Sequence, residues 1–175
     1  SFDFKNRKSC LVIPEGILFE WINLFKFSIM CAKKNPHVMF IFRLHPFITF
    51  KKIKSKSSIL NDLPLNIMLS NNSIEEDIEK SNWMLYRGSS TVLQGLSVGL
   101  RPFYVDFNDK ISIDPLYKMN DFRISLKNPD DFSKHVQFDI DNKFVDHFKY
   151  KNSNTSFCNN ILTDFDHSIL PSLLN

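Results

Sequence analysis

The stretch that most constrains the fold is W-M-L-Y-R-G-S-S-T-V-L-Q-G-L-S-V-G-L-R-P-F-Y-V-D, residues 83–106. It opens with four apolar residues and breaks at Gly88. Three hydroxyl side chains then lead into an apolar helical pattern, and a second apolar run closes the stretch at 102–105. Apolar runs broken by glycine and joined by a helical period predict a strand, a tight turn, a helix and a second strand.

The turn in this unit is a candidate anion site. Gly88, Ser89, Ser90 and Thr91 would present backbone N–H groups and hydroxyls at a helix N-terminus, where partial positive charge attracts anions such as phosphate. Serine and threonine are also ordinary N-caps, and from spacing alone this capping interpretation is the commoner one. Both interpretations stay open at this point.

The same alternation of strand and helix runs along most of the chain. Apolar, β-favouring runs predict strands at 10–13, 38–44, 66–69, 83–86, 102–105 and 122–126. Helical spacing predicts helices at 17–34 and 73–80 and another that begins after Asn128-Pro129, and the segment 47–62 reads as a loop with a short helix.

This pattern predicts an α/β fold: a Rossmann-like three-layer sandwich, with a mostly parallel sheet of about six strands and helices on both faces. We expect residues 1–9 to be a linker and residues 10–138 to form the domain. Residues 139–175 are expected to be a helical tail packed on that domain or on a missing N-terminal one.

Composition narrows the class of partner. A net charge of +3 and one basic run at 51–56 without interleaved aromatic residues argue against nucleic acid as a partner. Three scattered cysteines predict neither a disulfide framework nor a metal site. No apolar segment is long enough to span a bilayer, and the polar start leads us to expect no signal peptide. We expect a cytoplasmic protein, with peripheral association at the inner face of the membrane as an alternative.

Three loops should meet at one edge of the sheet, because ligands of parallel sheets bind at the carboxyl ends of the strands. They are the loops at 14–16, 43–46 and 87–91. Arg43 and His45 alternate along the end of one strand, so their side chains share a face, and Pro46 disfavours helix at His45. A guanidinium and an imidazole beside the Ser-Ser turn would form a cradle for a pyrophosphate. The alternative for His45 is a simple hydrogen bond at a strand end.

The order of these motifs also carries a resemblance. Residues 10–135 resemble the C-terminal nucleotide-binding half of GT-B glycosyltransferases. The likeness lies in the order of strand, R-x-H-P, short strand, capped acidic helix, strand and G-S-S-T-V-L-Q-G-L-S-V-G-L-R-P. The likeness is greatest to bacterial capsule and surface-polysaccharide transferases and to sialyltransferase-like enzymes with His-Pro and Ser-Ser motifs.

The resemblance implies a donor site for a nucleotide-activated sugar, with no cofactor and no metal. The residues implied are Glu15, Gly16, Arg43, His45, Pro46, Gly88, Ser89, Ser90, Thr91 and Gln94. His45 and Arg43 would stabilise the charge of the leaving nucleotide, while Gln94 stands where many relatives have a ribose-binding glutamate.

The resemblance also implies what this stretch lacks. GT-B enzymes bind the acceptor in an N-terminal domain, and 175 residues are too few for that domain in addition to the nucleotide-binding one. The chain also starts without methionine. We therefore expect a piece of a larger transferase, inactive alone. No carboxylate stands out as a catalytic base: the acids at 75–79 suggest a solvated helix face, and Asp106, Asp109 and Asp114 suggest solvated loops. The alternatives are a nucleotide-sugar 2-epimerase-like domain and a non-catalytic Rossmann-like interaction domain.

Overall fold

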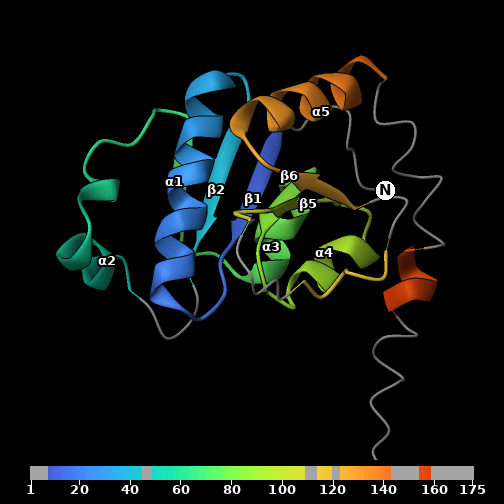
Figure 1. Cartoon of the computed structure of the whole chain (residues 1–175), viewed down its shortest axis with the longest axis horizontal. Helices are drawn as coiled ribbons and strands as arrows, with labels where there is room; N and C mark the ends of the chain where they lie inside the picture. The colour runs from blue at the N-terminus through green and yellow to red at the C-terminus, as the bar shows by residue number, and fades with distance from the viewer. Residues whose placement is uncertain (1–7, 45–48, 109–113, 120–122, 143–153, 159–175) are drawn as a thin grey trace, which may run out of the picture.

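The apolar runs form six parallel strands in one sheet, in the order β3-β2-β1-β4-β5-β6 (Figure 1). The computed structural model describes residues 8–44, 49–108, 114–119, 123–142 and 154–158. The strands are β1 (Ser9–Ile13), β2 (Met39–Arg43), β3 (Ile67–Ser70), β4 (Trp83–Tyr86), β5 (Arg101–Val105) and β6 (Ile124–Leu126). The predicted six-stranded, Rossmann-like sheet is therefore confirmed, and all of its strand pairs are parallel.

The helices begin and end where the sequence provides caps and stops. Ser73 and Glu76 form a capping box at α3, and Asn128 and Asp131 form one at α5, where Pro129 is the first helical residue. The helices are α1 (Leu18–Lys34), α2 (Phe50–Lys56), the 3-10 helix η1 (Ser58–Leu60), α3 (Ile74–Glu79), α4 (Val92–Ser97) and α5 (Pro129–Asp141).

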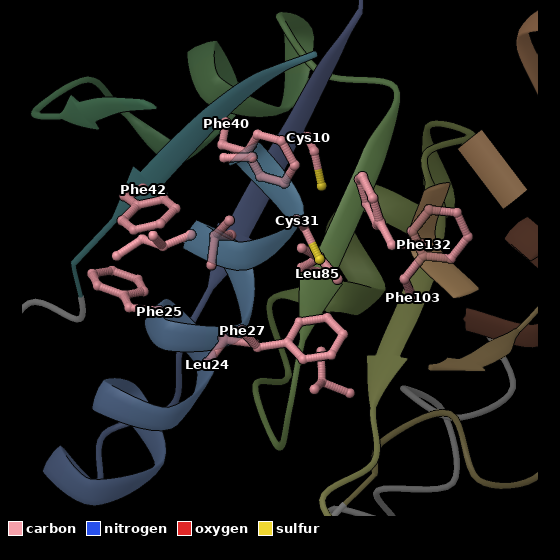
Figure 2. Close-up of a cluster of buried hydrophobic side chains, with 14 of the residues drawn as sticks. Cys10, Leu24, Phe25, Phe27, Cys31, Phe40, Phe42, Leu85, Phe103 and Phe132 are labelled. Carbon is pink, nitrogen blue, oxygen red and sulfur yellow. The ribbon is translucent and has the colours of Figure 1, made fainter. Parts of the chain in front are cut away.

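Helices cover both faces of the sheet, so the sandwich has three layers (Figure 1). Alternate residues of each strand enter two separate cores. On the face covered by α1 and α5, aromatic rings of both helices pack against aromatic rings of the strands. Trp21 stacks on Phe25 at 4.6 Å between ring centroids, and Phe25 lies 4.1 Å from Phe42. Figure 2 shows this cluster, in which Phe132 of α5 packs against Phe103 of β5.

The second face is covered by α3 and α4 and by a part of the predicted tail. A short helical segment at 154–158 packs against α4, where the Thr155 hydroxyl donates to the Ser97 carbonyl and the Cys158 thiol to the Leu93 carbonyl. Helix α5 continues past position 138, the predicted end of the domain, and ends at Asp141. None of the helices in the described ranges is both long and apolar enough to cross a membrane.

The strand order determines where a ligand site can form. From β1 the chain proceeds outward through β2 to β3, then returns to the other side of β1 and proceeds through β4 to β6. The order therefore reverses between β1 and β4, and the loops that follow these two strands diverge to opposite faces. In open parallel sheets this divergence leaves a crevice at the carboxyl ends of the strands, where ligands bind.

Candidate functional site

A pocket of about 180 Å³ opens at the carboxyl ends of β1 and β2 and reaches the first turns of α3 and α4. Its lining residues are Ile13, Pro14, Arg43, Leu44, Ile74, Ser89, Thr91 and Gln94. Four residues predicted for the donor site, Arg43, Ser89, Thr91 and Gln94, thus line one pocket although up to 51 positions separate them in the chain, from 43 to 94. The pocket combines an apolar wall with polar groups that can orient a ligand.

The hydroxyls of the turn are available to a ligand. Thr91 is the N-cap residue of α4, yet no side-chain capping hydrogen bond is made there. Ser89 is only 9% exposed and lines the pocket, and its hydroxyl has no hydrogen-bond partner in the described part of the chain. The structure therefore gives no support to the interpretation that these side chains serve only as caps. The Ser89 hydroxyl is not among the buried polar atoms left without a partner, so it is accessible from the pocket that it lines.

Arg43 lies in the wall of the pocket as the partly exposed half of an ion pair with a buried carboxylate. Its Nη1 donates to Asp77 Oδ2 at 2.9 Å and to the Asn72 carbonyl at 2.7 Å. Asp77 is fully buried and also accepts hydrogen bonds of 2.7 Å from the Ser70 hydroxyl. This network joins the end of β2 to α3, whose first residue, Ile74, lines the same pocket.

Glu15 lies outside the lining of the pocket, packed against the turn at Gly88. A Cβ added to Gly88 would meet the Glu15 Oε2 at 2.3 Å, and the φ of Gly88 is +75°. Burial raises the pKa of the Glu15 carboxyl, the neighbouring charge of Glu20 raises it further, and Arg87 lowers it. The positive φ explains why glycine is favoured at this turn.

Arg87 anchors the start of the same turn. Its Nε donates to Glu20 Oε2 of α1 at 2.6 Å, and its Nη1 donates to the Val105 carbonyl at 3.2 Å. Its guanidinium also lies 4.9 Å from the centre of the Phe107 ring. The arginine thereby connects α1, the end of β4 and the end of β5, so the backbone that presents Ser89 is held from three sides.

The remaining predicted residues are not part of the pocket. Gly16 and Ser90 are exposed at the same edge of the sheet without lining it. His45 and Pro46 lie outside the described residues, so their predicted roles stay predictions. Within the described ranges, no group of three or more His, Cys, Asp or Glu side chains could hold a metal ion.

Two acidic residues differ from the prediction that they are solvated. Asp77 is buried as the partner of Arg43. Asp114 is 8% exposed, accepts from the Tyr86 hydroxyl at 2.8 Å and pairs with Arg123. The position of Asp77 at i+3 from Ile74, on the apolar side of a short helix, is a signal that could have identified it. For Asp114, in an irregular segment, the sequence offers no such signal.

Comparisons with known proteins bear on the fold. No protein-family model and no curated protein sequence matches this chain. A solved structure of the glycotransferase of kitacinnamycin is similar, with a TM-score of 0.56 and 12% identity over 87% of this chain and 41% of that one. The UDP-N-acetylglucosamine 2-epimerase from Rickettsia bellii gives a TM-score of 0.46 and 16% identity over 93% of this chain and 46% of that one. The chain thus spans less than half the length of either protein, and the likeness to the glycotransferase establishes a GT-B-like, Rossmann-like fold.

Proposed function

We propose that this chain is the donor-binding domain of a glycosyltransferase, which binds a nucleotide-activated sugar in the pocket at the carboxyl ends of β1 and β2. The observation that carries the proposal is the convergence of Arg43, Ser89, Thr91 and Gln94 on one pocket, beside the point where the strand order reverses. The GT-B-like fold adds support, because such a crevice is where open parallel sheets bind ligands.

The polar groups of the pocket suit the phosphate end of such a donor. A sugar transfer leaves negative charge on the departing nucleotide, and pre-oriented donors stabilise that charge without reorganisation. The Arg43 guanidinium and the Ser89 and Thr91 hydroxyls would supply these donors. The Gln94 amide can hydrogen-bond a sugar or ribose hydroxyl as a neutral group. None of these contacts requires a metal ion.

The acceptor and the catalytic base would come from outside this pocket. None of the described side chains that line it is a carboxylate or an imidazole, so the lining offers no general base. We therefore assign the chain the donor half of the reaction and assign the acceptor half to a partner domain. The acceptor we propose is a growing surface polysaccharide, which agrees with the sequence resemblance to capsule transferases.

Calorimetric titration of the chain with CMP, UDP, GDP and CDP tests the donor site. We expect one nucleotide to bind, and Ser89→Ala and Gln94→Ala to weaken it by about 1 kcal/mol each, the net value of a neutral hydrogen bond. Ser97→Ala, at the far end of α4, is the matched control and should bind as the wild type does. Absence of binding by all four nucleotides, in a chain shown by circular dichroism to be folded, would refute the proposal.

A further inference from the structure

The hydrogen bonds of Arg43 use only one of its three nitrogens. Nη1 has two hydrogens, and these are directed to Asp77 Oδ2 and to the Asn72 carbonyl. A guanidinium has five N–H groups, so three remain, on Nε and Nη2. Within the described ranges these three have no partner, although Arg43 lines the pocket and is 24% exposed. The edge formed by Nε and Nη2 is the geometry that receives two oxygens of a phosphate or carboxylate in parallel.

The groups that hold Nη1 are themselves tightly held. Asp77 has no exposed surface, and both of its oxygens lie 2.7 Å from the Ser70 hydroxyl. Asn72 Nδ2 donates to Asp77 Oδ1 at 3.2 Å, and the Asn72 backbone N–H donates to the Ser70 hydroxyl at 3.1 Å. A buried carboxylate with this many partners has one favourable arrangement, so it restricts the rotation of the guanidinium bound to it.

We propose that Asp77 is a positioning residue, which together with the Asn72 carbonyl turns the Arg43 guanidinium so that its Nε–Nη2 edge receives two oxygens of one anionic group of the ligand. The inference rests on the donor site proposed above and specifies how that site recognises its anion. The ligand must present a pair of coplanar oxygens, as a phosphate or pyrophosphate does. The Ser89 hydroxyl, which lines the same pocket, would bind the same group.

An ion pair that only stabilises the fold would behave differently. Lysine at position 43 would keep the positive charge near Asp77 but has no planar fork to offer a ligand. If the pair is only structural, Arg43→Lys changes stability and leaves the affinity of a folded chain unchanged. If Asp77 positions the fork, the affinity falls although the charge is retained.

The test measures binding of UDP, CMP, GDP, CDP and inorganic pyrophosphate by calorimetry, beside urea unfolding of each variant. We expect Arg43→Lys and Asp77→Asn each to weaken binding about ten-fold, as for one lost charge-assisted hydrogen bond. The double variant should be scarcely weaker than either single one, because both changes disable the same contact. Glu79→Gln, an exposed acid on the same helix α3, is the control and should bind as the wild type does.

The outcomes separate this inference from the proposed function. Nucleotide binding that Arg43→Lys or Asp77→Asn leaves unchanged in a folded chain overturns the positioning role and keeps the donor site. Arg43-dependent binding of pyrophosphate without binding of any nucleotide keeps the positioning role and refutes the donor site. If neither a nucleotide nor pyrophosphate binds, both the donor site and the positioning role are refuted. If Asp77→Asn does not fold, Ser70→Ala replaces it, since it removes one support of Asp77 and should weaken binding in the same direction.

Discussion

Replacing Gly88 with alanine should destabilise the chain by about 1–2 kcal/mol, and the cost should come from the backbone rather than from a steric clash. Gly88 has a φ of +75°, which an L-residue with a Cβ adopts at a cost of about 1–2 kcal/mol. A Cβ at this position would also meet the Glu15 Oε2 at 2.3 Å and its Cδ at 2.7 Å. Substituting Glu15 removes the clash but not the backbone strain, so the two contributions can be separated by experiment.

The steric contribution should be small. The atoms that a Cβ would meet belong to the end of a flexible side chain, and the Glu15 carboxylate has no hydrogen bond in the described ranges. It can therefore rotate away at little cost. The backbone has no such freedom, because Arg87 next to Gly88 is held by Glu20 and by the Val105 carbonyl. The strain of a positive φ has to be borne by the turn itself.

Urea unfolding at constant pH measures both contributions. In a double-mutant cycle, Glu15→Ala should leave the cost of Gly88→Ala unchanged to within about 0.5 kcal/mol, as expected for uncoupled changes. Gly88→Asn is the matched control: asparagine tolerates positive φ, so it should cost less than alanine although it adds the same Cβ. A cost that disappears in the Glu15→Ala background, or an asparagine variant less stable than the alanine one, would refute the argument.

Three further changes test the packing and charges around the site. Folding raises the pKa of Glu15, so the folded chain binds this proton more tightly than the unfolded chain, and the free energy of unfolding falls as pH rises through that pKa. Glu15→Gln should therefore flatten the pH dependence of the free energy of unfolding, measured with urea between about pH 4 and 7. Parallel curves for the wild type and the variant would contradict this prediction. Gly95→Ala places a Cβ 2.1 Å from the Met84 sulfur and should cost about 1–3 kcal/mol of stability, which Met84→Ala should relieve in the same assay. Asp114→Ala removes the partner of Arg123 and should cost about 3 kcal/mol, whereas a loss under 1 kcal/mol would show that the pair contributes little.

The fold could be predicted from the sequence because its signals are local. Each strand is a short apolar run with a clear end, and each capping box places a helix start within a few residues. The helix predicted at 17–34 is observed as α1, Leu18–Lys34, since Pro36 prevents its continuation. The sixth strand is shorter than predicted and consists of Ile124–Leu126, with residues 120–122 outside the described ranges.

The site was predictable only in part, because side-chain partners depend on tertiary contacts. Sequence order and the rule for parallel sheets were enough to bring Arg43 and Ser89 to one edge. They could not show that Asp77, one of four acids within five residues, turns inward to Arg43 while the other three acids stay exposed. Nor could they show that Glu15 packs on Gly88 instead of lining the pocket. Glu15 precedes α1 and Gly88 precedes α4, and these helices cover opposite faces of the sheet, so the sequence gives no sign that the two residues meet.

The two arginines at this edge suggest how the proposed site would recognise an anion. Arg43 is paired with Asp77 and Arg87 with Glu20, so neither contributes an uncompensated positive charge. A net positive field is therefore a poor account of binding, and the small net charge of the chain agrees with this. Anion binding would then depend on N–H and O–H groups directed at the ligand, which stabilise negative charge best when their orientation is fixed before the ligand arrives. The paired carboxylates then have a clear role: they compensate the charge of the arginines and determine where the guanidinium donors point.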